Sequence, residues 1–133
     1  MEEFHNLKVK DVMQHRVWDL PLVNENADIK FVLVILTTRG YVWVVNNTKE
    51  LLLKGVITEH DALDLFDNFN DEWKARDLMK KNVIYCTREE NVADVINKIR
   101  ENKVRRLPVL EDGKLIGEIT LRLLIEKFYS LLF

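Results

Sequence analysis

The sequence predicts a mixed α/β (α+β) fold made of two repeats, each ordered roughly β-α-β-β-α and packed with pseudo-twofold symmetry. Two recurring motifs carry this prediction. Lys8-Val-Lys-Asp-Val-Met13 returns as Lys74-Ala-Arg-Asp-Leu-Met79, and Gly55-Val-Ile-Thr58 returns as Gly117-Glu-Ile-Thr120. A short unit that cannot bury its own apolar face is stabilised by packing against a copy of itself, and the seam between copies is a natural ligand cleft.

The motif spacings set the repeat boundaries. The first motif is displaced by 66 residues (8 to 74) and the second by 62 (55 to 117), so loops changed length while the ends of the unit stayed recognisable. We assign residues 7–69 to the first repeat and 70–133 to the second, together forming one compact module. The short polar stretch Asp67–Asp71 is the linker candidate between them.

After its opening motif, Lys8–Met13 or Lys74–Met79, each repeat is expected to form a strand and then a helix. The β-rich stretches Val17–Leu20 and Val83–Cys86 are the expected strands. In the second repeat an i, i+3, i+4, i+7 apolar stripe from Val92 to Ile99 predicts a helix, with Thr87 or Asn91 as its cap. The first-repeat counterpart, residues 31–36, is apolar all round, so periodicity leaves helix and strand open and only the match between repeats favours a helix.

A hairpin and a second helix complete each repeat. In the second repeat Arg106–Leu110 and Leu115–Thr120 flank the turn Asp112-Gly113, which is a strong hairpin signal. In the first repeat Tyr41–Val45 is followed by a longer polar loop and then by Leu51–Thr58. A helix with spaced apolar residues is expected after each closing threonine.

Composition excludes several classes of function. The net charge is -2, from 20 basic and 22 acidic residues, which disfavours general binding to nucleic acid or to anionic membranes. The longest strongly apolar run has six residues, Phe31 to Leu36, far below the ~20 that span a bilayer, and the first residues resemble no signal peptide. A single cysteine, Cys86, precludes an intrachain disulfide and favours a reducing compartment, so we expect a cytoplasmic protein in which Cys86 is a small buried residue.

No motif for catalysis or metal binding stands out. The sequence contains no Gly-x-Gly-x-x-Gly, P-loop or Gly-x-Ser-x-Gly motif. His5, His15 and His60 lack metal-ligand spacing, and no acid–base or nucleophile arrangement emerges. We therefore expect neither an enzyme nor a zinc site.

The motifs, in their order and repetition, resemble the cystathionine β-synthase (CBS) domain, which is usually found in tandem as a Bateman module. The resemblance covers nearly the whole chain and is carried by Gly55–Asp61, Ala75–Met79, Val104–Val109 and Gly117–Thr120. It implies a regulatory, non-catalytic module that binds adenosine-containing ligands in clefts between repeats, often as a dimer. AMP, ADP or ATP is the expected ligand class, with S-adenosylmethionine as a further possibility and no required cofactor.

The resemblance also implies roles for residues of the first repeat. In the family's Gly-hydrophobic-hydrophobic-Thr-x-x-Asp segment, the Asp holds the ribose and the Thr holds a phosphate or ribose oxygen, which here are Asp61 and Thr58. Ile57 and His60 belong to the same ligand-binding segment, and His60, opposite Arg122 when the repeats are aligned, is expected to be a weaker cation than an arginine. A purely structural interpretation stands beside this one, because Thr58 and Asp61 have the spacing of a helix capping box.

The second repeat departs from this pattern. Leu123 stands where the family has Asp, so the ribose site next to Thr120 is expected to be defective. The resemblance implies instead that Arg105, Arg106 and Arg122 contact the phosphates of a ligand whose ribose is held by the other repeat. We therefore predict one competent composite site and one degenerate site, against the alternative that these arginines are ordinary solvated residues.

Three hypotheses of function follow. The first is a nucleotide sensor that signals to an unknown effector protein in trans. The second is a ligand-free dimerisation or scaffold module whose clefts are filled by Tyr41, Trp43 and Leu123, although Trp43 on an apolar strand is more commonly a core residue. The third, disfavoured by the net charge, is nucleic-acid binding through the arginines.

The last residues bear on assembly. Residues 128–133 are largely apolar and would form an exposed patch if nothing covered them. They are expected to cover a core or a dimer interface, or else to lead into a further domain. A homodimer is our expectation.

Overall fold

A computed structural model describes residues 1–133, and the chain folds into two compact units. Unit 1 comprises residues 1–17 and 84–133, and unit 2 comprises residues 18–83. The chain therefore passes from one unit to the other at 17/18 and at 83/84, and the polar stretch Asp67–Asp71 lies inside unit 2.

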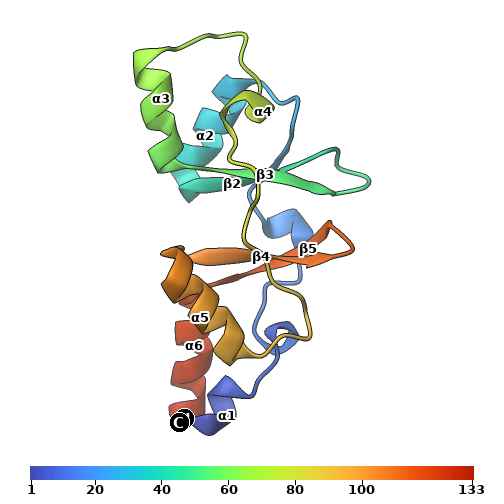
Figure 1. Cartoon of the computed structure of the whole chain (residues 1–133), viewed down its shortest axis with the longest axis vertical. Helices are drawn as coiled ribbons and strands as arrows, with labels where there is room; N and C mark the ends of the chain where they lie inside the picture. The colour runs from blue at the N-terminus through green and yellow to red at the C-terminus, as the bar shows by residue number, and fades with distance from the viewer. The chain divides into compact units, whose positions relative to one another are not determined.

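Unit 2 is a three-stranded sheet with helices on one face (Figure 1). The strand order is β1-β2-β3, with β1 parallel and β3 antiparallel to β2. Its elements are η2 Val17–Asp19, which begins at the last residue of unit 1, β1 Leu22–Asn24, α2 Ile29–Arg39, β2 Tyr41–Val45, β3 Leu53–Thr58, η3 Glu59–Asp61, α3 Ala62–Asp67 and α4 Ala75–Leu78. Alternate residues of the strands bury against the helices, because successive strand side chains point to opposite faces. That core is formed by residues such as Val42, Val44, Ile57 and Leu65.

Unit 1 has a two-stranded antiparallel sheet, β4-β5, with α5 and α6 on one face (Figure 1). Its elements are α1 Glu2–His5, η1 Val9–Asp11, α5 Val92–Asn102, β4 Arg106–Glu111, β5 Lys114–Thr120 and α6 Leu121–Leu132. Asp112 and Gly113 form the predicted tight turn, with φ of 51° and 81°. Phe4 of α1 packs edge-on against Phe128 of α6, with ring centroids 5.1 Å apart.

The first helix predicted in each repeat is confirmed, as α2 in the first repeat and α5 in the second. The all-apolar segment of the first repeat lies in α2, which begins after Asp28, whose side chain accepts the Lys30 N–H, and ends at Gly40 in the left-handed conformation. The amphipathic segment of the second repeat forms α5 after Asn91. For residues 31–36, where periodicity did not distinguish helix from strand, the match between repeats therefore predicted the correct structure.

The predicted strand at Val17–Leu20 was wrong. Residues 17–19 form a 3-10 turn, and β1 starts only at Leu22. Proline has a fixed φ and no N–H, so Pro21 marks the entry to the strand rather than its interior. Its carbonyl nevertheless accepts the Trp43 N–H at 2.8 Å, which ties the strand entry to β2.

The predicted strand at Val83–Cys86 was also wrong, apart from one residue. Only Cys86 pairs with β4, donating its N–H to Pro108 O at 3.1 Å and accepting the Leu110 N–H at 2.9 Å. Extension of this parallel ladder would need the residue at 108 to donate to the carbonyl of Ile84, and proline has no N–H. Trp43 occupies the equivalent place in β2, which explains why only the first repeat keeps a strand here.

The repeated basic motifs pack across the sequence repeats. Lys80, just after the motif of the second repeat, exchanges backbone hydrogen bonds of 2.8 and 3.0 Å with Val56 of the first. Gln14, just after the motif of the first repeat, does the same with Glu118 of the second, at 2.8 and 3.2 Å. Each compact unit thus consists mainly of one repeat plus the opening segment of the other.

Candidate functional site

The Asp61 carboxylate lies where β3 turns into η3 and α3. Its side chain is only 5% exposed. Oδ2 accepts the Thr58 N–H at 2.8 Å and the Thr58 hydroxyl at 3.3 Å, while Oδ1 lies 3.7 Å from Lys80 Nζ. The capping role suggested by the spacing is therefore present, and it occupies one oxygen. A carboxylate offers about four lone-pair sites, so Oδ1 keeps acceptor capacity for a ligand.

Other residues predicted for this segment are divided between surface and core. Ile57 is fully buried in the unit 2 core. His60 is exposed on η3. Tyr41 lies opposite Thr58 in the β2–β3 ladder and contacts Trp43 edge-on, with centroids 5.6 Å apart. Trp43 is 1% exposed, which confirms that it is a buried residue.

Sequence reasoning missed Lys80. Its backbone is held on β3 beside Val56, two residues before Thr58, and its side chain is 64% exposed. The equivalent residue in unit 1 is Gln14, paired with Glu118. The repeats therefore differ at two linked positions, Lys80 with Asp61 in one unit and Gln14 with Leu123 in the other. This signal is visible in the sequence only once the opening motifs are known to pair with the other repeat.

In unit 1 the predicted basic residues gather at one end of the hairpin. Arg106 pairs with Thr120 across the β4–β5 ladder. The Arg105 carbonyl accepts the Leu121 N–H at 2.8 Å, at the first residue of α6. Arg122, two residues after Thr120, has an 88% exposed side chain whose Nε is 3.6 Å from Glu126 Oε1. Three guanidinium groups thus come from the start of β4 and the start of α6.

Thr120 and Leu123 have local structural roles. The Thr120 hydroxyl caps α6 by accepting the Leu123 N–H at 3.1 Å. The Leu123 side chain packs against the unit 1 core. Unit 1 therefore has an apolar side chain where unit 2 has the Asp61 carboxylate.

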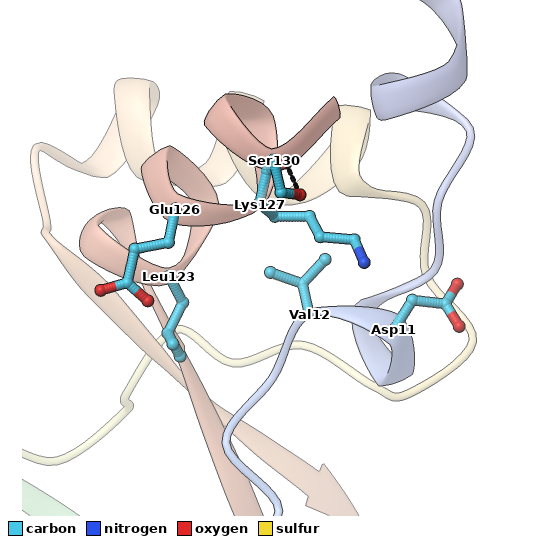
Figure 2. Close-up of a pocket in the computed structure, with 6 residues that line it drawn as sticks. All are labelled: Asp11, Val12, Leu123, Glu126, Lys127 and Ser130. Carbon is cyan, nitrogen blue, oxygen red and sulfur yellow. Dashed lines mark hydrogen bonds between the residues drawn. The ribbon is translucent and has the colours of Figure 1, made fainter. Parts of the chain in front are cut away.

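Leu123 also lines a shallow pocket of about 230 Å³ between α6 and η1. Figure 2 shows the pocket with Lys127 extending past Val12. Two of its polar side chains serve the fold: Asp11 accepts the Lys8 N–H at 2.9 Å, and the Ser130 hydroxyl donates to the Lys127 carbonyl at 2.6 Å. The charged groups that these contacts leave in the pocket are the Lys127 ammonium and the exposed Glu126 carboxylate.

Cys86 is fully buried, as expected, with Sγ 3.8 Å from Pro108 O. The pKa of this thiol is raised to about 12, mainly by burial and to a smaller extent by the nearby Glu90 carboxylate. Lys98 lowers the pKa by less than Glu90 raises it. Since the thiolate is the nucleophile, Cys86 is unreactive at neutral pH.

The structure also bears on metal binding and on membrane insertion. No three His, Cys, Asp or Glu residues of the chain are positioned to hold a metal ion. A helix with the length and apolarity needed to cross a membrane does not occur in the structure.

Comparison with known proteins gives concordant results. The sequence model of the CBS domain matches residues 9–68 and 75–130. The uncharacterised protein MJ1225 of Methanocaldococcus jannaschii is 33% identical over 118 residues, covering 86% of this chain and 40% of that protein. The chain spans less than half the length of the curated relatives it matches.

Solved structures confirm the predicted fold class. The crystal structure of CBSX2 in complex with AMP has a TM-score of 0.82 and 26% identity, covering 93% of this chain and 97% of that one; CBSX2 is a CBS-pair protein from Arabidopsis thaliana. The CBS domain pair of MJ0100, solved with 5'-methylthioadenosine and S-adenosyl-L-methionine, has a TM-score of 0.74 and 22% identity, covering 92% and 99%.

Proposed function

The chain belongs to the CBS domain family, and from this premise we propose that it is a regulatory CBS-pair module whose Thr58 and Asp61 bind the ribose of an adenine nucleotide. One observation carries the proposal. Oδ2 of Asp61 accepts the backbone N–H of Thr58, while the other oxygen, Oδ1, lies beside the exposed Lys80 and can accept from a ligand. A structure of similar fold, CBSX2 at 26% identity, was solved with AMP, which supports AMP, ADP or ATP as the ligand class.

The chemistry of a ribose suits this carboxylate. The two vicinal hydroxyls of a ribose can both donate to one carboxylate, and hydrogen bonds to a charged group are the stronger kind. A ligand without the diol would leave a nearly buried carboxylate oxygen without that partner. Such a loss is what allows a polar site to reject a close analogue.

The sequence-based assignment of phosphate contacts to Arg105, Arg106 and Arg122 stays a prediction, as does the composite site that it implies. Unit 1 has Leu123 in place of the carboxylate, so we propose one competent nucleotide site in the chain and one degenerate site. The buried, solitary Cys86 suits a reducing compartment, and we assign the module to the cytoplasm.

The proposed output is a change in affinity for an effector protein in trans. Ligand can shift a conformational equilibrium only by its differential affinity for the two states, so the coupling is expected to be about 1–3 kcal/mol.

We also propose that the module is a homodimer. Helix α6 exposes a row of large apolar side chains at helical spacing. They are Leu121, Ile125, Phe128, Tyr129 and Leu132. A second copy of the chain would remove this row from water.

The test of the ribose site is AMP binding to wild type and to Asp61→Asn. Asparagine keeps an oxygen to accept the Thr58 N–H, so the turn should persist while the charged acceptor is lost. Loss of charge-assisted hydrogen bonds, each worth roughly 1.5–3 kcal/mol, predicts at least about tenfold weaker binding by calorimetry. Asp64→Asn, which removes the same charge from an exposed position of α3, should bind AMP like wild type.

Two other results would count against the proposal. If Asp61→Asn binds AMP as tightly as wild type does, the Asp61 carboxylate does not hold the ribose. Failure of adenosine ligands to bind or stabilise a folded wild-type protein at millimolar concentration would favour the scaffold hypothesis. That alternative is supported by the burial of Trp43 and its contact with Tyr41.

A further inference from the structure

We propose that Lys80 makes the unit 2 site selective for anionic adenosine ligands, which are nucleotides, over neutral or cationic ones such as adenosine or S-adenosylmethionine. The proposal rests on the proposed function and deepens it, because it names the charge class of the ligand.

The backbone of Lys80 is fixed at the site. It exchanges two hydrogen bonds with Val56, of 2.8 and 3.0 Å, two residues before Thr58. Gly55 permits this approach, since a Cβ on that residue would lie 2.7 Å from the Lys80 carbonyl oxygen. The position of residue 80 relative to Thr58 and Asp61 is therefore set by the fold of unit 2 itself.

The side chain of Lys80, in contrast, is loosely held. It is 64% exposed, and its Nζ lies 3.7 Å from Asp61 Oδ1, beyond direct hydrogen-bond distance. A lysine ammonium is a compact charge on a flexible four-carbon stem. The Lys80 ammonium can therefore leave Asp61 without disturbing the backbone bridge to Val56.

A mobile Lys80 ammonium can balance the negative charge that a nucleotide phosphate adds near Asp61. A nucleotide that donates its diol to Asp61 brings a phosphate close to a nearly buried carboxylate, and the two negative charges repel each other. If the diol takes over Oδ1, the Lys80 ammonium is released to pair with the phosphate, so neither the carboxylate nor the phosphate lacks a partner. A sulfonium or ammonium group at the same place would be repelled by Lys80.

The other unit supports a ligand role for this pair. Unit 1 has Gln14 in the place of Lys80 and Leu123 in the place of Asp61, so the cation and the carboxylate are both missing from the equivalent site. The Lys80 ammonium is 64% exposed and beyond hydrogen-bond distance of Asp61, so its pairing with the carboxylate contributes little to folding. Its occurrence in the unit that keeps the ribose carboxylate therefore points to ligand charge.

The experiment is calorimetric titration of AMP, adenosine and S-adenosylmethionine into wild type, Lys80→Gln and Lys80→Arg. Lys80→Gln should lower the preference for AMP over adenosine by about twofold to fivefold, the range for an ion pair partly open to solvent. Adenosine affinity should change by less than about twofold, and Lys80→Arg should retain the preference. AMP affinity should fall with added salt, and fall less steeply in Lys80→Gln.

Lys81→Gln is the matched control, because it removes the same charge from the exposed neighbouring residue. An unchanged AMP-to-adenosine ratio in Lys80→Gln, or an equal change in Lys81→Gln, would overturn the assignment to Lys80. If binding still depends on Asp61 in that case, the proposed function survives and only this inference fails. If the wild type binds no adenosine ligand, both fail.

Discussion

Substitution of Gly117 by alanine tests why the two motifs recur in the sequence. A Cβ at this position would lie 2.3 Å from the Gln14 carbonyl oxygen and 2.3 Å from Met13 Cε. Real Cβ atoms do not approach other atoms so closely, so the opening segment must move away from β5. The glycine of one repeat and the methionine of the other thus form a docking pair.

The expected cost follows from the contacts that would be lost. The hydrogen bonds from Gln14 N–H to Glu118 O (2.8 Å) and from Glu118 N–H to Gln14 O (3.2 Å) would lengthen or break. Each contributes about 0.5–1.5 kcal/mol net. Partial exposure of Met13, which is buried in the unit 1 core, adds about 1 kcal/mol, and the reduced freedom of the unfolded chain returns about 0.5 kcal/mol. We expect unit 1 to lose about 2–3 kcal/mol of unfolding free energy.

Urea denaturation followed by circular dichroism measures the loss, and amide hydrogen exchange localises it. Protection of the Gln14 and Glu118 amides should fall more than that of the α5 amides. Lys114→Ala, an exposed change on the same strand, should stay within about 0.5 kcal/mol of wild type. Stability of Gly117→Ala within 1 kcal/mol of wild type, with both amides still protected, would refute the docking argument.

Two other predictions concern the cysteine and the assembly. The raised pKa of Cys86 means that the thiol ionises near pH 9 when unfolded and near 12 when folded, so its contribution to stability is complete below pH 9 and falls as pH rises toward 12. At pH 8 its reaction with a thiol reagent should be at least about 100-fold slower in native protein than in urea, and equal rates would contradict its burial. Ile125→Glu with Tyr129→Glu should convert a dimer to a monomer by light scattering, while Ser130→Glu, off the apolar row, should not. A dimer that survives the double substitution would place the interface elsewhere.

Prediction from sequence succeeded where repetition and local chemistry agreed. The Asp112-Gly113 turn and the helix beginning at Val92 were both predictable, because a turn with positive φ and an apolar stripe are local properties. The strand expected at Val17–Leu20 begins only at Leu22, after Pro21. The strand expected at Val83–Cys86 was not formed, because whether an apolar segment pairs depends on the donors of its neighbour. Trp43 supplies an N–H to that ladder, and Pro108 does not.

Some residues of the candidate site could be predicted from the sequence, and one could not. Asp61, Thr58 and the asymmetry at Leu123 could be predicted, because they occur inside a recognisable repeated motif. Lys80 could not, because it belongs by sequence to the other repeat and reaches Asp61 only through strand pairing with Val56.

The sequence by itself therefore determined that two mixed α/β repeats are present, that they carry the motifs of one family, and that only one has an aspartate at the position of Asp61. The tertiary structure decided which opening segment packs on which sheet, which strands are completed, and which cation lies beside Asp61. The physical reason is that repeated motifs identify equivalent surfaces but not their partners. Two copies of a docking motif fit two copies of its strand, and the chain connectivity and packing of the folded protein select between those pairings.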